Sequence, residues 1–272
     1  MMSATHFAIA LKGIVVREVL RFLSQRGRFF AALVRPLIWL LVFAAGFRAA
    51  LGEVLAPPYE AAVTYEVYIV PGLLGMIQLF NGMQSALSMV YDREMGSMKI
   101  LLVAPLPRWY LLTCKLLAGT AVSCLQVYTF LLLASLFGIR FPALGYGALA
   151  PALIVSGLML GAIGLFLSSA IRQLENFAGI MNFVIFPMFF LSSALYPIWQ
   201  IEESSPFLAI LCRLNPFTHA IELIRFALHL QLNVAALAYT GAALAVFLAL
   251  AIIGYSPDKG LMQRKHGMMG GQ

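Results

Sequence analysis

The residues whose types and spacing could do chemistry lie towards the end of the chain. His219 and Glu222 are one helical turn apart, a spacing that could bring an imidazole and a carboxylate together for metal binding or proton transfer. A metal site normally needs a third and a fourth ligand, and the other nearby histidine, His229, is ten residues further on. The commoner use of such spacing is an ion pair between Glu222 and Arg225, so we expect no metal site here.

The chain carries none of the sequence signatures of an ATPase or a hydrolase. A GxxxxGKS/T loop that would cradle ATP phosphates is absent, and neither HExxH nor GxSxG occurs. We therefore expect no catalytic residue, no metal and no cofactor bound by this chain. An intramembrane enzyme that acts on lipids through His219 or Glu222 stays open as an alternative.

A stripe of polar residues lies within an otherwise apolar stretch. Gln78, Asn81, Ser85 and Ser88 follow helical spacing, so they share one face, which cannot point to lipid cheaply. Interhelical hydrogen bonds are the commoner use of such a stripe, and lining a substrate path or a subunit interface is the alternative. Candidate partners lie in a later apolar stretch, at Thr120, Ser123 and Gln126.

The elements that must position these residues are membrane spans. Hydrophobic residues make up 62% of the chain and charged residues 11%, and the mean hydropathy is +0.91, which is typical of a membrane protein. At ~20 residues per crossing, 272 residues fit one helical bundle of about six spans. We predict an all-α protein with spans near Arg35–Gly52, Val67–Val90, Leu111–Phe137, Leu144–Ile171, Phe177–Trp199 and Val234–Tyr255.

Basic residues predict the orientation of these spans. With the N-terminus inside, four of the eighteen Lys and Arg residues fall on the far side, namely Arg48, Arg140, Arg213 and Arg225. The other fourteen are Lys12, Arg17, Arg21, Arg26, Arg28, Arg35, Arg93, Lys99, Arg108, Lys115, Arg172, Lys259, Arg264 and Lys265. Such a bias predicts that both termini are cytoplasmic. It also explains the net charge of +7 without nucleic-acid binding.

Three segments outside the spans have distinctive patterns. Residues Phe7–Phe29 predict an amphipathic interface helix with Arg17, Arg21, Ser24 and Arg28 on one face; a basic flank that only fixes topology is the alternative. Residues 91–108 form a charged loop punctuated by proline. Residues 196–230 predict two short re-entrant helices broken at Asn215-Pro216, with Asn215 as cap and Pro216 in the first position.

These features together resemble the membrane subunits of type-2 ABC exporters, the ABC-2 family. Arg93-Glu94-x-Gly96-x4-Leu101-x3-Pro105, followed by Arg108 and Lys115, is similar to the cytoplasmic coupling region of that family. The stretch Leu214–Arg225, which contains Asn215, Pro216 and Glu222, is similar to the segment before the family's last span. Within the family, residues 93–107 are most similar to permeases encoded beside bacterial alcohol-oxidation systems.

The resemblance implies a single permease domain over 1–272, with an interface helix at 1–34, a six-helix bundle at 35–255 and a cytoplasmic tail at 256–272. It implies a homodimer in the bacterial inner membrane, surrounded by lipid and exporting a cargo. A separate cytoplasmic ATPase, which uses ATP and Mg, would hold each copy through the interface helix and through Arg93, Glu94, Gly96, Leu101, Pro105 and Arg108.

An ATP-independent secondary transporter or channel is the main alternative. Ion-coupled transporters usually place an ionisable residue near the middle of the membrane, and the central parts of the predicted spans have none.

Overall fold

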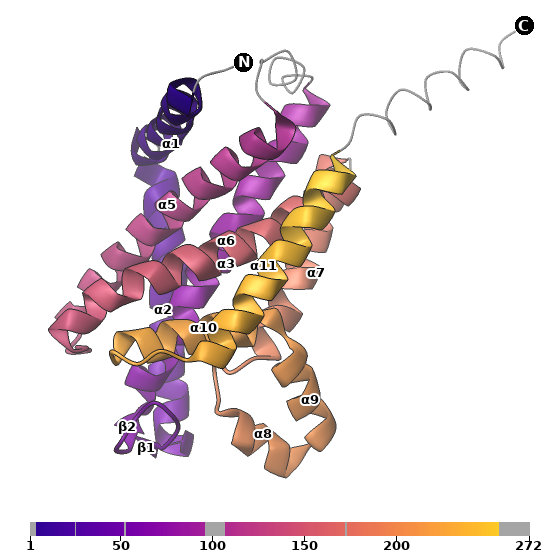
Figure 1. Cartoon of the computed structure of the whole chain (residues 1–272). Helices are drawn as coiled ribbons and strands as arrows, with labels where there is room; N and C mark the ends of the chain where they lie inside the picture. Colours follow the sequence, from indigo (N-terminus) through magenta and orange to yellow (C-terminus); the bar gives the residue numbers. More distant parts are fainter. Residues whose placement is uncertain (1–3, 25, 52, 96–106, 172, 256–272) are drawn as a thin grey trace, which may run out of the picture.

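The computed structural model describes residues 4–24, 26–51, 53–95, 107–171 and 173–255 (Figure 1). Labels follow Figure 1. The helices are α1 (Ala4–Ser24), α2 (Arg26–Leu51), α3 (Tyr65–Glu94), α5 (Arg108–Leu136), α6 (Ala143–Ala170), α7 (Leu174–Phe190), α8 (Ile198–Ser204), α9 (Pro206–Leu214), α10 (Pro216–Leu228) and α11 (Val234–Gly254). A short antiparallel pair, β1 (Glu53–Val54) and β2 (Val63–Thr64), lies between α2 and α3. The predicted all-α class is confirmed.

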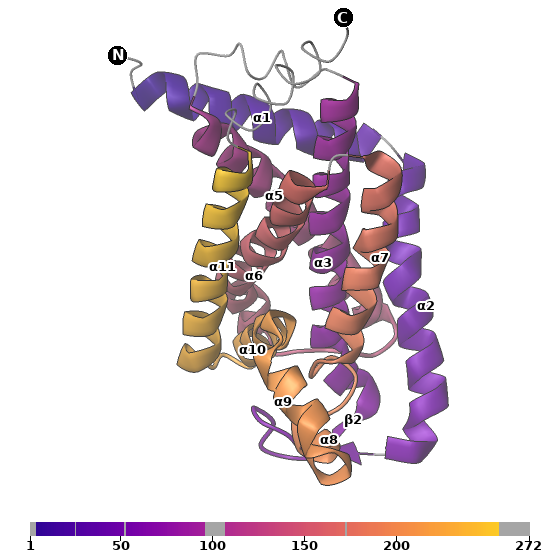
Figure 2. The same cartoon turned by 90° about the vertical axis from the view of Figure 1, so that its right-hand side faces the viewer.

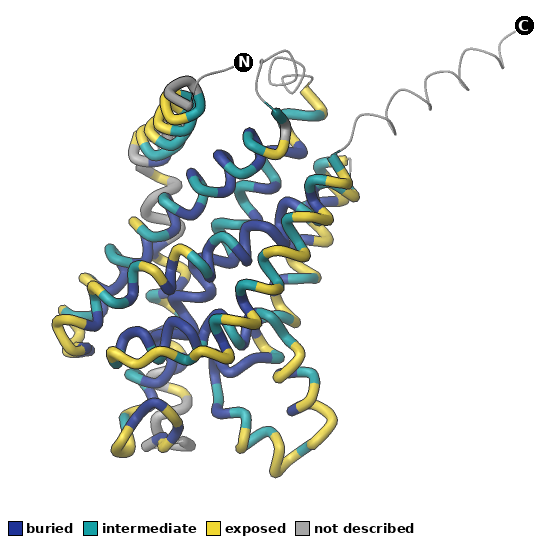
Figure 3. Tube along the Cα trace, viewed as in Figure 1, coloured by how far each residue is buried: buried dark blue, intermediate teal, exposed yellow. Residues whose placement is uncertain are grey.

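Helices α3 and α6 form the centre of the bundle, and the buried residues concentrate along them and along α10 (Figure 3). Glycines permit this close packing, because a Cβ on Gly82 would lie only 2.9 Å from the Cα of Gly161. A Cβ on Gly164 would in turn lie 2.9 Å from the carbonyl oxygen of Gly82. Small residues let two helix backbones approach where longer side chains would hold them apart.

The two ends of the bundle differ in shape. Figure 2 shows α1 lying across one end, at a steep angle to α3, α7 and α11, while α8 and α9 project from the opposite end. The predicted helix Phe7–Phe29 is divided in the structure, because α1 ends at Ser24 and residues 26–29 begin α2. The end covered by α1 is called the α1 end below.

Three of the described helices are long and apolar enough to cross a membrane: Trp109–Leu136, Ala143–Ala170 and Val234–Gly254. Helices α9 and α10 would add a fourth crossing if the pair, bent by 75°, is one broken span. The predicted interruption at Asn215-Pro216 is confirmed by this bend. Helix α3 carries the polar stripe, which lowers its mean hydropathy, and the count of six spans stays a prediction.

The predicted span Phe177–Trp199 is wrong in its helical extent. Helix α7 ends at Phe190, and the chain turns through residues 191–197 before α8 begins. Side chains bond the carbonyl groups at this end: Ser192 Oγ donates to Phe189 O at 2.6 Å, and Asn215 donates to Met188 O and to Leu191 O, directly after the helix. Apolar composition alone does not reveal such capping from a distant segment.

Candidate functional site

The last turn of α3, at the α1 end, divides its side chains between the bundle and the surface. Asp92 and Arg93 are partly buried against neighbouring helices, whereas Tyr91, Glu94 and Met95 are exposed. Successive residues of a helix point in directions about 100° apart, so adjacent positions can serve the interior and the exterior in turn. Among the charged residues predicted to form the coupling region, Glu94 therefore lies on the surface, whereas Arg93 is turned towards the neighbouring helices.

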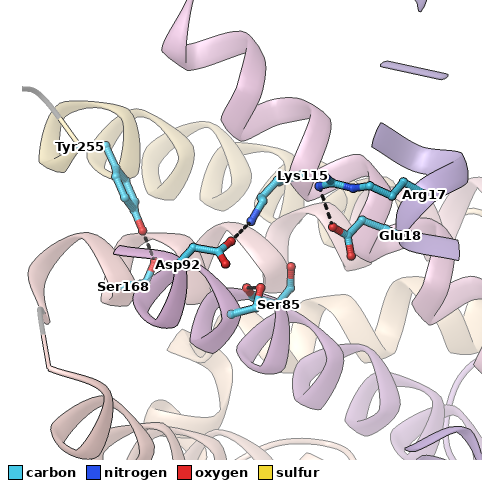
Figure 4. A network of polar contacts seen from close by, with 8 residues as sticks. Arg17, Glu18, Ser85, Asp92, Lys115, Ser168 and Tyr255 are labelled. Atoms are coloured by element: carbon cyan, nitrogen blue, oxygen red, sulfur yellow. Dashed lines mark hydrogen bonds and ion pairs between the residues drawn. The ribbon is translucent and has the colours of Figure 1, made fainter. Parts of the chain in front are cut away.

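Arg93 reaches from α3 to the C-terminal end of α6. Its Nη2 donates to Ser168 O at 2.8 Å and its Nη1 to Ile171 O at 3.5 Å. Its guanidinium carbon lies 4.8 Å from the centre of the Tyr255 ring, and the Tyr255 hydroxyl hydrogen-bonds Ser168 Oγ at 2.7 Å (Figure 4). The last carbonyls of a helix lack internal partners and carry partial negative charge, which favours a cation there. Arg93 thus joins α3, α6 and α11.

Asp92 joins α3 to α5. Its carboxylate accepts a hydrogen bond from Lys115 Nζ at 2.9 Å (Figure 4), and the Lys115 side chain is only 9% exposed against 31% for Asp92. A buried ammonium needs its counter-ion, because the charge has left most of its water behind. From the sequence, Lys115 was predicted to follow the coupling loop, and its ion pair with Asp92 was not predicted.

Helix α1 is attached to the start of α5. The Tyr110 hydroxyl donates to the carbonyl of Phe7, and the two rings meet edge to face with centroids 4.8 Å apart. Arg17, predicted for the interface helix, is exposed and pairs with Glu18 at 3.2 Å (Figure 4). Several other predicted residues fall outside the described part: the side chains of Arg21, Arg28 and Arg108, and Gly96, Leu101 and Pro105 entirely.

In the middle of α3, side chains of the polar stripe hydrogen-bond to neighbouring helices of the same chain. Gln78 is 1% exposed; it donates to Leu153 O at 2.7 Å and accepts from Ser156 Oγ at 2.6 Å, both on α6. Asn81 donates to the side-chain oxygen of Gln126 on α5. The predicted interhelical bonding is confirmed for Gln78 and Asn81, with Gln126 as a partner. The prediction is wrong for Ser88, Thr120 and Ser123, which donate to carbonyls of their own helices. Ser85 lines a narrow cleft between α3, α5 and α6, and whether that cleft is a path stays a proposal.

At the opposite end of the bundle, Asn215 ties two helix ends together. Its Oδ1 accepts the backbone N–H of Phe217 at 3.0 Å, which caps α10, and Pro216 occupies the first helical position. Its Nδ2 donates to Met188 O at 2.8 Å and Leu191 O at 2.6 Å, at the end of α7. The predicted N-cap is confirmed, and the second role, towards α7, comes from the tertiary fold.

A buried arginine follows on α10. Arg225 is 1% exposed; its Nη1 donates to Glu222 at 2.5 Å and its Nη2 to Ser193 O at 2.7 Å. Its guanidinium carbon lies 4.3 Å from the Tyr68 ring, and the Tyr68 hydroxyl donates to the same Ser193 carbonyl at 3.1 Å. We call these four residues the Arg225 clasp. The predicted Glu222–Arg225 pair is confirmed.

Tyr59, from the segment between the two short strands, borders the clasp. Its ring meets that of His229 edge to face at 4.8 Å, and His229 Nδ1 lies 3.1 Å from Arg225 O. Burial raises the pKa of Tyr59, and the nearby Arg225 charge partly opposes this. The phenol is therefore neutral at physiological pH, and its hydroxyl is buried without a hydrogen-bond partner among the described residues.

The imidazole of His219 has a packing role in the structure. Its ring stacks on Tyr239 with centroids 3.8 Å apart, and its Nε2 lies 2.8 Å from Arg213 O. Within the described ranges, no group of three His, Cys, Asp or Glu side chains is arranged to hold a metal ion.

Residues 9–229 of the chain match the ABC-2 type transporter family. The chain belongs to that family. The resemblance drawn from the charged loop and from the segment around Asn215 is thereby confirmed. Like other ABC-2 members, the chain is a multi-pass membrane protein and a transport permease.

Three relatives of the chain are also named as permeases. The chain is 28% identical over 219 residues to the ycf38 protein of Porphyra purpurea, named as a transport permease; the match covers 79% of this chain and 72% of that one. The ycf38 protein of Cyanophora paradoxa is 30% identical over 207 residues, 72% of this chain and 66% of that one. YbhR of Escherichia coli, named as a multidrug ABC transporter permease, is 29% identical over 170 residues, 61% of this chain and 45% of that one.

Sequence reasoning missed the clasp residues outside α10. Ser193 and Tyr68 lie far from Arg225 in the chain and look like ordinary residues of an apolar region. The one available signal was a spacing: Tyr65 and Tyr68 are one helical turn apart, and both donate to carbonyls of the turn after α7, at Leu195 and Ser193. Such pairing becomes visible only when the turn is placed beside α3.

Proposed function

We propose that this chain is the membrane subunit of an ATP-binding-cassette exporter and is driven by a separate cytoplasmic ATPase that binds ATP and Mg. The family match over residues 9–229 carries the proposal. It is supported by the absence of a P-loop from the sequence, which leaves the energy source to another subunit. YbhR, a relative named as an ABC transporter permease, supports the same class.

The α1 end of the bundle is the proposed ATPase-binding surface. Glu94 and Met95 are exposed at the end of α3. Helix α1 lies across the same end of the bundle (Figure 2), and its Arg17 side chain is exposed. Directly behind this surface, Asp92 and Arg93 connect α3 to α5, α6 and α11. A displacement of α3 by a bound ATPase would therefore be transmitted through Asp92 and Arg93 to α5, α6 and α11.

We further propose six crossings, cytoplasmic termini and a homodimer in the bacterial inner membrane. The distribution of basic residues supports the orientation, because it places the α1 end inside the cell. The exposed apolar faces of α5, α7 and α11 support burial in lipid or against a second copy. Export is the proposed direction, and the narrow cleft beside Ser85 is the proposed start of the cargo path.

Co-purification of this chain with a co-expressed candidate P-loop ATPase tests the proposal. Charge reversal by Glu94→Lys should reduce the amount of bound ATPase, and ATP-driven transport in vesicles, about tenfold. The reversed charge replaces an attraction with a repulsion, and a loss of about 1.4 kcal/mol in binding free energy lowers the affinity tenfold. The matched control is Glu203→Lys, an exposed glutamate of α8 at the opposite end, which should change neither.

Two outcomes would contradict the proposal. Glu94→Lys that binds and transports like the unmodified chain would remove the assigned surface. Transport by the purified chain in liposomes, without ATP or a second subunit, would instead make it a secondary transporter or channel. A lipid-modifying enzyme would require loss of a lipid product in His219→Ala.

A further inference from the structure

We propose that the Arg225 clasp is a releasable lock, which holds the bundle closed at the end opposite α1 and opens during each transport cycle. This inference rests on the proposed function, since it gives the ATP-driven movement a place to act. Three observations lead to it: the connections that the clasp makes, the buried polar atoms that it leaves without partners, and its position on α3.

The clasp connects three segments that are far apart in the sequence. Arg225 belongs to α10, Tyr68 to the first half of α3, and Ser193 to the turn after α7. The carbonyl of Ser193 accepts from both Arg225 and Tyr68 and so lies at the meeting point. Release of these bonds would remove the polar contacts that join α10 to both α3 and the turn, and would leave the bond from Tyr65 to Leu195 O between α3 and the turn.

Backbone contact makes the closed arrangement tight. A Cβ on Gly72, one turn after Tyr68, would lie 2.5 Å from the carbonyl oxygen of Ala194. The turn therefore lies directly on the α3 backbone at that position. A path between α3 and the turn therefore requires the turn to move.

The chemistry of the clasp suits release better than permanent stability. A fully buried arginine has lost its hydration, and an apolar side chain of similar size often stabilises such a site as well or better. Moreover, Arg225 Nε, Tyr59 Oη and Ser193 Oγ are buried without a hydrogen-bond partner in the part of the chain that the structure describes. Buried polar groups are normally paired, so this cluster would gain hydrogen bonds on opening to water.

Helix α3 links the clasp to the proposed ATPase-binding surface. It runs unbroken from Tyr65 to Glu94, and Tyr68 and Arg93 are separated by about 37 Å along its axis at 1.5 Å per residue. A tilt of α3 imposed at Glu94 would displace Tyr68 at the other end. The Ser193 carbonyl could not then satisfy Tyr68 and Arg225 together.

Thiol labelling of Ser193→Cys tests the lock. Ser193 is 1% exposed and its hydroxyl makes no hydrogen bond within the described residues, so a thiol should be tolerated. The background chain has Cys114, Cys124 and Cys212 replaced by alanine. The complete complex with its ATPase, in lipid nanodiscs, is treated with a water-soluble maleimide, either free of nucleotide or trapped with ATP by an ATPase variant that cannot hydrolyse it.

ATP trapping should raise the labelling rate of Ser193→Cys at least about tenfold, because a buried thiol reacts only through the open population. The matched control is Thr240→Cys, which is 0% exposed on α11 and lies outside the clasp. Its labelling should stay low in both states. Equal, low labelling of Ser193→Cys in both states, in a complex that hydrolyses ATP before trapping, would overturn the proposal.

A second measurement needs no ATPase. Glu222→Gln removes the charge that holds Arg225, and the Glu222 side chain is 21% exposed, so this variant should fold. It should raise the nucleotide-free labelling of Ser193→Cys several-fold while Thr240→Cys stays protected. Unchanged labelling would refute the lock. Because this measurement involves the permease alone, failure to find a bound ATPase would contradict the proposed function and leave the clasp result standing.

Discussion

Replacing Asn215 by aspartate should destabilise the chain, although general capping preferences predict no effect. Asparagine and aspartate are about equally good N-caps, since both offer an oxygen to the first backbone N–H groups of a helix. In this chain the amide also donates from Nδ2 to Met188 O at 2.8 Å and to Leu191 O at 2.6 Å. An aspartate carboxylate can still accept from the Phe217 N–H. It cannot donate to the carbonyl oxygens of Met188 and Leu191, so two acceptors would face each other at both bonds.

The expected cost follows from the bonds lost. The loss of two hydrogen bonds at about 1 kcal/mol each lowers the free energy of unfolding by about 2 kcal/mol. The two carbonyls left without a donor and the partly buried carboxylate raise the total loss to about 3 kcal/mol. For a chain of this size, 1 kcal/mol corresponds to about 2–4 °C in Tm, so the apparent Tm should fall by about 6–12 °C. Asn215→Ala, which loses the cap as well as both donor bonds, should fall in the same range.

Thermal unfolding of the detergent-purified chain, followed by its monodisperse fraction, measures this. All variants are heated at one rate, because membrane proteins often unfold irreversibly. Asn233→Asp is the matched control: Asn233 caps α11 by accepting from Ala236 N–H at 2.9 Å, and its amide makes no donor bond within the described residues. That variant should stay within about 2 °C of the parent. Asn215→Asp behaving like this control would refute the double-cap reasoning.

Two further substitutions test other contacts by the same assay. Gly72→Ala should lower the free energy of unfolding by about 1–3 kcal/mol, because its Cβ would lie 2.5 Å from Ala194 O and the backbone must shift. The control is Gly241→Ala, whose Cβ would meet no atom within 4 Å and which should be neutral or stabilising. Equal effects of the two substitutions would contradict the close contact at Gly72. Asp92→Asn should cost about 1–2 kcal/mol, less than a fully buried pair because Asp92 is 31% exposed. Adding Lys115→Met should restore most of that loss, and a double variant no better than Asp92→Asn would argue against a buried unpaired charge.

The sequence alone determined the class of the protein and several local features. Long apolar stretches fix an all-helical membrane protein, because each spanning segment must satisfy its own backbone hydrogen bonds. Local motifs were equally readable: Asn215-Pro216 caps and starts α10, and Glu222 pairs with Arg225 one turn away, since both depend on residues a few positions apart. The same short-range patterns carried the resemblance to the ABC-2 family.

Only the tertiary structure decided which distant residues meet. Arg93 looked like a residue for a partner protein, and the fold turns it inward onto the carbonyls of α6 and the ring of Tyr255. Asn215 bonds the carbonyls of Met188 and Leu191 at the end of α7, a contact that only the fold brings about. The buried Arg225 finds an acceptor in the carbonyl of Ser193, which only the fold brings beside it. These contacts join segments separated by tens of residues, so their energies depend on how the helices pack.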